Sequence, residues 1–159
     1  MYMAAPTYEE IVDIIDFRLN QVIELLNEFE YELNACTSRE LYDYLNGENF
    51  KDSKITFRDR LGNEYLFLHS IIEIGELKGA GVEINSKTIV STPKDVLYGA
   101  HLKAMDYELG YCLILEDFYW LKHRLAHLGQ DIETDEHIPE ELKGKATEIY
   151  NSFLEYKNM

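Results

Sequence analysis

Two histidines in the C-terminal half of the chain have the spacing of a metal-binding or catalytic pair. His123 and His127 lie four residues apart in a segment that we expect to be helical, so their imidazole rings share one helix face. Zinc sites use at least three protein ligands, and no Asp or Glu follows this pair at the spacing of known zinc-binding helices. His101 lies too far back on the same expected helix to supply a third ligand. We therefore predict a solvated or interface-facing histidine pair, with no metal site and no cofactor.

A second interpretation of this segment involves Lys122 and His127, which are separated by four residues. The stretch that ends in Arg-Leu-Ala-His127 resembles the end of the catalytic helix of HEPN-type ribonucleases, in which an arginine stands at the position of Lys122. Residues 71–77, IIEIGEL, loosely resemble another helix of some family members. The resemblance implies an all-helical fold and metal-independent RNA cleavage, with His127 as acid or base at the 2′-hydroxyl and Lys122 beside the phosphate.

Paired carboxylates occur at several places, but none has the full arrangement of a magnesium site. Glu73 and Glu76 have the spacing of the helical ExxE pairs that bind magnesium in some pyrophosphohydrolases. Those enzymes need a second acidic pair on a neighbouring helix, and the candidate that begins at Glu108 ends in Tyr111. With thirty acidic residues in the chain, we expect such pairs by chance.

The strongest pattern interleaves carboxylates with tyrosines and runs from residue 28 to residue 50. Carboxylates attract cationic side chains, and aromatic rings add packing and cation–π contact, so this composition suits a surface that binds a Lys- and Arg-rich partner. The residues that we expect to contact such a partner are Glu24, Glu28, Tyr31, Glu32, Tyr42, Asp43 and Tyr44. The alternative interpretation is a solvated helix surface with half-buried tyrosines.

The net charge is strongly negative and unevenly distributed. The 159 residues carry a formal charge of −15. Residues 1–50 hold eleven acidic and two basic residues, residues 51–100 are balanced, and residues 101–159 hold twelve acidic and six basic residues. Such a field repels nucleic acids and anionic membranes and attracts cationic proteins. We therefore predict a basic protein partner, with no direct nucleic-acid or membrane binding.

Two helices are expected to present the acidic segment. Apolar residues recur at three- and four-residue steps from Ile11 to Leu33, which predicts an amphipathic helix over residues 8–34 with Thr7 as its N-cap. A shorter helix is expected to start after Thr37 and to end at Asn46-Gly47.

The periodicity changes after Lys54. At the start of residues 54–69, apolar and polar residues alternate. After a turn at 61–63 the segment is rich in strand formers, so it predicts a β-hairpin. A second, weaker strand pair is expected over residues 81–90. Residues 64–78 as a whole fit either a strand or a helix, because periodicity alone does not decide between them.

The rest of the chain is predicted to be helical. One long helix is expected from about Pro93 to residue 128, with Gly129 at its end, and it is apolar around most of its girth. Such a helix is usually central to a domain or part of an oligomer interface, so we predict either a homodimer through residues 105–125 or a partner helix packed against them. An acidic loop over residues 130–138 and a final helix that Pro139 opens complete the expected elements.

These elements predict an α+β fold class: a single helix-rich domain over residues 1–159, with a small antiparallel β-meander between an N-terminal helical segment and C-terminal helices. Cys36 and Cys112 match no metal or disulfide spacing and are expected to be buried free thiols, which suits a cytoplasmic protein. The predicted function is a non-enzymatic acidic binding module, similar to an inhibitor, immunity protein or antitoxin. The HEPN-like ribonuclease with Lys122 and His127 is the alternative.

Overall fold

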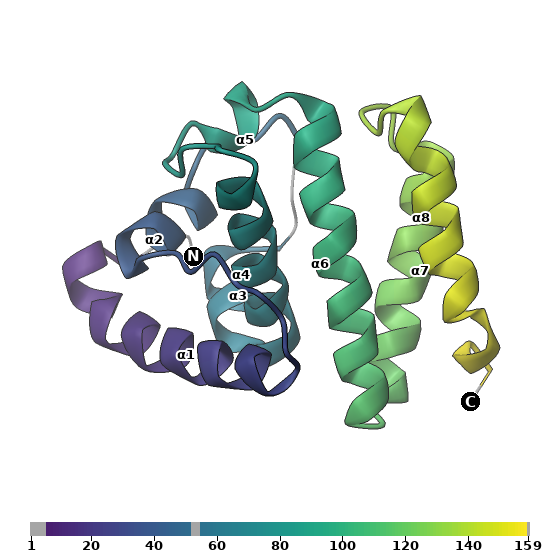
Figure 1. The fold of residues 1–159 in the computed structure, drawn as a ribbon, viewed down its shortest axis with the longest axis horizontal. Helices are drawn as coiled ribbons and strands as arrows, with labels where there is room; N and C mark the ends of the chain where they lie inside the picture. Colours follow the sequence, from purple (N-terminus) through teal and green to yellow (C-terminus); the bar gives the residue numbers. More distant parts are fainter. Residues whose placement is uncertain (1–5, 52–54, 159) are drawn as a thin grey trace, which may run out of the picture. The chain divides into compact units, whose positions relative to one another are not determined.

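The computed structural model describes residues 6–51 and 55–158, and within them the chain is helical and contains no strand (Figure 1). The chain forms two compact units, divided in the sequence between Thr92 and Pro93. The helices of the first unit are α1 (Tyr8–Glu28), α2 (Ser38–Leu45), α3 (Phe57–Gly62), α4 (Glu64–Gly79) and α5 (Thr88–Ser91). Those of the second are α6 (Lys94–Ile114), α7 (Phe118–Thr134), α8 (Glu140–Ser152) and the short 3-10 helix η1 (Leu154–Tyr156). Among these helices, none combines the length and the hydropathy that a membrane crossing requires.

The predicted α+β fold class is therefore wrong, because the described residues form no β-meander. The predicted hairpin over residues 54–69 is α3 and the first part of α4; its first position, residue 54, lies outside the described residues. The second strand pair, predicted over residues 81–90, is a turn followed by α5.

The misassigned segment has no helical periodicity because α4 is buried around its whole circumference. Every residue from Tyr65 to Gly75 is buried, so the apolar side chains are not confined to one face of the helix. Asn63, which resembled a hairpin turn residue, is the N-cap of α4, and its side-chain oxygen accepts hydrogen bonds from the backbone N–H groups of Tyr65 and Leu66 at 2.9 and 3.0 Å. These eleven consecutive buried residues are more than an ordinary strand contains, and their length is that of a helix.

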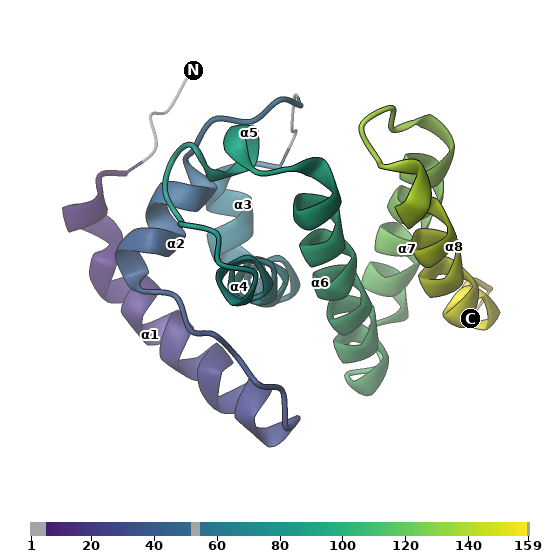
Figure 2. The ribbon, with the colours of Figure 1, turned by 45° about the horizontal axis from the view of Figure 1, so that its top comes forward.

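Helix α4 lies at the centre of the first unit. Helices α1, α2 and α3 each pack against it, and Figure 2 shows them beside α4, which is seen there nearly end-on. The fully buried side chains of this unit include Ile15, Leu26, Leu41, Phe67, Leu68, Ile71, Ile72, Ile74 and Leu77.

The first three helices all begin with the same reciprocal hydrogen bonds. Helices α1, α2 and α3 start at capping boxes in which a threonine side chain accepts from a backbone N–H three residues later, and the carboxylate at that position accepts from the threonine N–H. The pairs are Thr7–Glu10, Thr37–Glu40 and Thr56–Asp59. The predicted caps of the first two helices are thus confirmed.

Helix α1 ends at Glu28, six residues before the predicted end at residue 34. Glu30 has a φ of 58°, in the left-handed region, and reverses the chain. The N–H of Tyr31 then donates to the carbonyl of Leu26 at 3.0 Å, the six-to-one bond of a Schellman motif. Leu33, the last residue of the apolar pattern, lies in the following non-helical segment and is half-buried.

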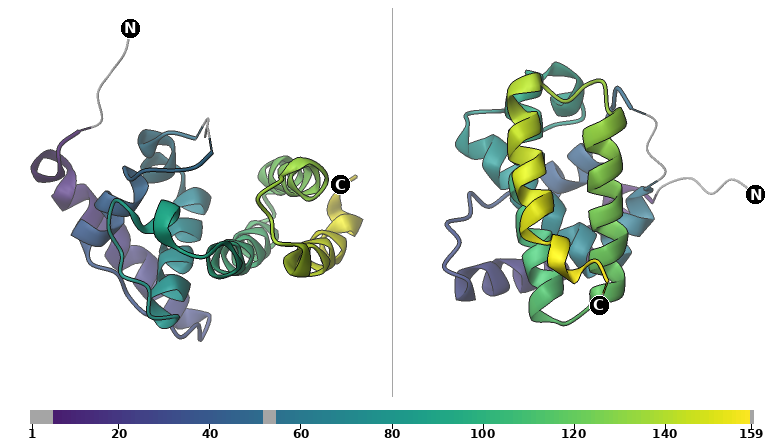
Figure 3. Two further views of the ribbon diagram at one scale, coloured as in Figure 1. Left: turned by 90° about the horizontal axis from the view of Figure 1, so that it is seen from above. Right: turned by 90° about the vertical axis from the view of Figure 1, so that its right-hand side faces the viewer.

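The second unit consists of α6, α7 and α8, each of which packs against the other two. The left panel of Figure 3 shows these three helices, coloured green to yellow, nearly end-on. Their buried side chains include Leu102, Met105, Leu109, Leu121, Leu125, Leu128, Ala146 and Ile149.

The predicted continuous helix after Pro93 is broken into α6 and α7. Glu116 has a φ of 55°, and the N–H of Asp117 donates to the carbonyl of Cys112 at 2.9 Å, so α6 also ends in a Schellman motif. Asp117 then caps α7 by accepting from the N–H of Trp120 at 3.0 Å. Residues 105–125 are therefore the end of one helix, a tight turn and the start of the next.

Helix α7 continues past Gly129 to Thr134, so the predicted loop over residues 130–138 is partly helical. A Cβ atom at Gly129 would lie 2.9 Å from Cε2 of Tyr150, which shows that this glycine allows α8 to pack closely on α7. The final helix begins after Pro139 as predicted. Both cysteines are buried free thiols, also as predicted, and burial raises the pKa of Cys36 to about 11.

Candidate functional site

One face of α1 carries acidic side chains around an exposed phenylalanine. At about 100° per residue, Glu10, Asp13, Glu24 and Glu28 all project within ~40° of Phe17. The four carboxylates are exposed, and so is 65% of Phe17. We call these five residues the acidic face. The buried residues of the helix, on its opposite side, are Ile15, Leu19 and Leu26.

Acidic residues are also concentrated at the end of α1 where they are least favourable. The C-terminal end of a helix carries partial negative charge and favours cations, yet the last turn of α1 contains no basic residue. Glu28 ends the helix, and Glu30 and Glu32 follow directly, all three exposed. Glu30 also has the left-handed backbone conformation that glycine or asparagine adopts at lower cost. This part of the sequence therefore does not favour stability.

A groove lies beside these carboxylates. It has a volume of about 420 Å³, and its lining residues are Ile23, Asn27, Glu30, Tyr31, Glu32, Leu33 and Ala35. The lining combines aliphatic side chains, one aromatic ring and two carboxylates, and no basic residue is among these lining residues. We call it the acidic groove.

The non-helical segment that forms one wall of the groove is tied to α4 by specific hydrogen bonds. The hydroxyl of Tyr31 donates to Oε1 of Glu76 at 2.7 Å, and Nδ2 of Asn34 donates to the carbonyl of Gly75 at 3.3 Å. Nζ of Lys78 donates to the carbonyl of Ala35 at 3.0 Å. These contacts fix the backbone of residues 31–35 without regular secondary structure.

Two glycines of α4 allow this segment to approach the helix. A Cβ atom at Gly75 would lie 2.8 Å from Cδ1 of Leu33 and 3.3 Å from the carbonyl oxygen of Asn34. A Cβ atom at Gly79 would lie 2.7 Å from Nδ2 of Asn34. Since Cβ atoms are not found at such short separations, the glycines at these positions set the place of the groove wall.

The residues predicted to bind a partner do not all lie together. Tyr31 and Glu32 line the acidic groove, whereas Glu24 and Glu28 belong to the acidic face of α1. The other three, Tyr42, Asp43 and Tyr44, lie on α2 and do not line the groove.

The three predicted residues on α2 have contacts within the first unit. The hydroxyl of Tyr42 donates to the carbonyl of Pro6 at 2.6 Å, and its ring packs edge-on against Tyr8 and Phe57, with centroids 5.6 Å apart in both cases. Asp43 pairs with Arg39 at 3.2 Å. Tyr44 is only 4% exposed, so its side chain belongs to the core and not to a surface.

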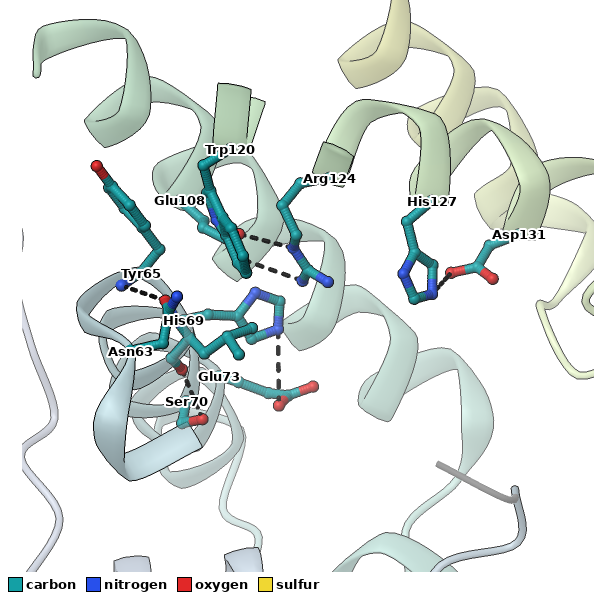
Figure 4. A network of polar contacts seen from close by, with 11 residues as sticks. Asn63, Tyr65, His69, Ser70, Glu73, Glu108, Trp120, Arg124, His127 and Asp131 are labelled. Atoms are coloured by element: carbon teal, nitrogen blue, oxygen red, sulfur yellow. Dashed lines mark hydrogen bonds and ion pairs between the residues drawn. The ribbon is translucent and has the colours of Figure 1, made fainter. Parts of the chain in front are cut away.

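Tyr44 is part of a buried polar cluster that the sequence analysis missed. Burial and the nearby carboxylate of Glu73, to which its hydroxyl is hydrogen-bonded, raise the pKa of Tyr44 well above its ordinary value of 10. One turn before Glu73, Nε2 of His69 lies 3.9 Å from Oε2 of that carboxylate (Figure 4). The available signal was a pair of titratable residues four positions apart within an apolar run.

A second buried cluster, also missed, joins α6 to α7. Nε and an Nη of Arg124 donate to the two carboxylate oxygens of Glu108 at 2.7 and 3.0 Å, and Nε1 of Trp120 donates to the same carboxylate at 2.9 Å (Figure 4). Glu108 is 0% exposed and Arg124 is 4% exposed. The charged Glu108 within an apolar stretch was the signal. Its bidentate, buried geometry is that of a structural ion pair.

The side chains of α7 that the alternative interpretation made catalytic, and the neighbouring His123, are not buried. Lys122 is half-buried, and His123 and His127 are exposed. Nε2 of His127 lies 3.7 Å from a carboxylate oxygen of Asp131, one turn later. Five positions along a helix correspond to about 140° of rotation, so Lys122 and His127 leave α7 in different directions. The two histidines, about 40° apart, do share a face as predicted.

Comparison with protein-family models, with curated proteins and with solved structures finds no match to this chain. The acidic face and acidic groove offer negative charge, an exposed aromatic ring and a preformed hollow, which together are suited to hold a cationic protein surface.

Proposed function

We propose that this protein is a non-enzymatic binding module that docks on a basic partner through its acidic face and acidic groove. In this role it resembles an inhibitor, an immunity protein or an antitoxin. The observation that carries the proposal is the concentration of Glu28, Glu30 and Glu32 at the C-terminal end of α1, beside a groove.

The unfavourable placement of these carboxylates has an explanation if a partner supplies the missing cations. Carboxylates at the negative end of a helix dipole are held there at a cost to the free protein. A basic side chain of a partner would neutralise both the carboxylates and the helix end, so the same residues that reduce stability strengthen binding. Sites that violate local stability rules in this way are often functional.

Phe17 supplies the apolar part of the proposed interface. Interfaces combine a few buried aromatic or aliphatic anchors with a charged surround. Phe17 is 65% exposed and Ile14 is 48% exposed, and both lie among the carboxylates of α1. The partner therefore needs a basic surface with an apolar depression.

Partner capture with two matched charge-reversal variants tests the proposal. Glu24→Lys, Glu28→Lys and Glu32→Lys together change the acidic surface of the first unit. The control changes three exposed carboxylates of the second unit by the same total charge: Glu133→Lys, Glu136→Lys and Glu141→Lys. A host protein that the parent retains at low salt is identified, purified and titrated against all three forms.

We expect the first variant to bind this partner at least about tenfold more weakly, because each lost charge pair and each added repulsion contributes to the free energy of binding. The control should change the dissociation constant less than about threefold, since it alters only the long-range field. Equal weakening by both variants, or no weakening by the first, would reject the docking surface.

The alternative function, a HEPN-like ribonuclease, keeps one supporting observation. The all-helical fold agrees with what that resemblance implies. RNA cleavage by the purified protein, abolished by Lys122→Ala and by His127→Ala, would establish the alternative. We expect no cleavage, because lysine lacks the planar fork of the arginine that the family has at this position, and the net charge of −15 repels RNA.

A further inference from the structure

We infer that the acidic groove receives an arginine side chain of the partner. This inference rests on the proposed function and adds the chemistry of the contact. The groove is formed by the first unit alone, and all of its lining residues lie between Ile23 and Ala35.

The aliphatic lining matches the stem of a long basic side chain. Ile23, Leu33 and Ala35 contribute apolar surface to the groove. Arg and Lys bury their methylene groups along such surfaces while the charged end stays near polar groups. A short cation, or an isolated metal ion, would leave this lining uncovered.

The carboxylates provide the polar end of the site. Glu30 and Glu32 are exposed and both line the groove, together with the side-chain amide of Asn27. A guanidinium group has five N–H donors in a planar fork, which can pair with two carboxylates at the same time. The ammonium group of lysine lacks that geometry.

Within the part of the chain that the structure describes, neither Glu30 nor Glu32 forms an ion pair. Lys78 donates to the carbonyl of Ala35 and pairs with Glu40 at 2.8 Å. Arg39 pairs with Asp43 and lies 4.8 Å from the ring centroid of Tyr8. The charge complement of Glu30 and Glu32 is therefore expected from another molecule.

Tyr31 favours arginine further. It lines the groove, and the hydrogen bond from its hydroxyl to Glu76 holds the ring in place. Guanidinium groups stack on aromatic rings more readily than ammonium groups do. Because the ring is already fixed in the free protein, ordering it costs little of the free energy of binding.

A nuclear magnetic resonance titration with a small probe tests the inference. N-acetyl-arginine-amide is added to the full chain at millimolar concentration, and the matched control is N-acetyl-citrulline-amide, which has nearly the same shape without the charge. We expect shifts of the backbone amide signals of Asn27 and of residues 30–35 with the arginine probe, and much smaller shifts with citrulline. The lysine analogue should bind more weakly than arginine.

Two variants sharpen this test. Ala35→Trp should fill the groove without changing the charge, and Glu30→Gln with Glu32→Gln should remove the charge with little change of shape. Each should weaken probe binding roughly fivefold or more, the first by blocking the groove and the second by removing two partly exposed ion pairs. Glu133→Gln with Glu136→Gln is the control and should leave it unchanged. Circular dichroism confirms that each variant is folded.

Three results would each overturn the inference. They are equal amide shifts with the citrulline probe, equal amide shifts near the carboxylates of the second unit, and unchanged probe binding by the Ala35→Trp variant. The proposed function fails separately. If charge reversal at Glu24, Glu28 and Glu32 weakens partner binding but Ala35→Trp does not, the docking surface stands and the arginine site is rejected. If the probe binds but the dissociation constant of the partner is the same for the parent and for all these variants, the docking role is rejected.

Discussion

Glu116 holds a left-handed backbone conformation at the turn between α6 and α7, with a φ of 55°. A side chain in this region costs about 1 kcal/mol relative to glycine, because its Cβ crowds the following carbonyl. We predict that Glu116→Gly raises the free energy of unfolding by about 0.5–1 kcal/mol, measured by urea unfolding.

The control for this prediction is Glu116→Ala, which removes the carboxylate but keeps a Cβ in the strained position. It should not reproduce the gain. Equal stabilisation by alanine would assign the effect to charge and not to the backbone.

A second prediction at the scale of single residues concerns the buried ion pair of Glu108 and Arg124. Arg124→Met leaves the carboxylate of Glu108 buried without its cationic partner and should cost about 3–5 kcal/mol of stability. The double variant with Glu108→Leu removes both charges and should recover most of that loss. Urea unfolding of the four proteins of this cycle measures the coupling. If the double variant loses as much stability as the two single variants added together, the two side chains act independently.

At the scale of elements, the capping boxes of α1, α2 and α3 should make stability depend on pH. Hydrogen bonds from Thr7 lower the pKa of Glu10, and those from Thr56 lower the pKa of Asp59. Burial opposes the ionised form of Glu40, but its bonds with Lys78 and Thr37 outweigh burial and lower the pKa. A lowered pKa in the folded state stabilises the fold above the ordinary values, 4.5 for Glu and 3.8 for Asp. That stabilisation is lost as the pH falls through the folded pKa.

The variant with Glu10→Gln, Glu40→Gln and Asp59→Asn keeps similar side chains but does not titrate. The parent should exceed it in stability at neutral pH, and the difference should shrink towards pH 3. Urea unfolding of both proteins at several pH values measures this difference. A difference that is constant with pH would contradict the role of the ionised caps.

Sequence periodicity predicted the helices that have one polar side, but it failed for α4. Helix α1 has an exposed face, α2 begins at a recognisable cap, and α8 follows Pro139, so their starts were predictable. Helix α4 is buried on all sides, and its aromatic and β-branched residues suggested strands instead. The turn at Glu116 contains neither glycine nor proline, so nothing local marked the end of α6.

The candidate site was predictable only in part, for a related reason. The carboxylates near the end of α1 stood out as charge, and their exposure follows from helix periodicity. The groove depends on contacts between residues 31–35 and α4, which are more than forty positions apart in the sequence. Tyr44 was assigned to the binding surface because its segment is acidic, although its helical position predicted an inward side chain, and the structure buries it.

For the whole molecule, the net charge of −15 should oppose self-association while apolar surface favours it. Ile114, Leu115 and Tyr119, around the turn between α6 and α7, are 63%, 46% and 84% exposed. The predicted homodimer through residues 105–125 should therefore strengthen with salt, as screening reduces repulsion. Sedimentation velocity at about 50 mM and about 500 mM NaCl measures the dimer fraction. Ile114→Ser with Tyr119→Ser should abolish it, and a protein that is monomeric under all conditions would reject the homodimer.

The single-domain prediction also belongs to this scale. Trp120, the one tryptophan of the chain, lies in the second unit and reports on it by fluorescence. Far-ultraviolet circular dichroism reports on the helices of both units. If residues 1–159 unfold as one domain, the two signals should change at the same urea concentration. Separate transitions would show that the units are independent domains.

Gly75 and Gly79 have a consequence for how mutations reveal the binding surface. Neither glycine lines the acidic groove, yet a methyl group on Gly75 would displace Leu33 and Asn34 and so change the shape of the groove. A genetic screen for variants that fold but no longer bind should therefore recover substitutions on α4 as well as on the charged surface. Some of the positions at which substitution abolishes binding would then lie outside the surface that contacts the partner.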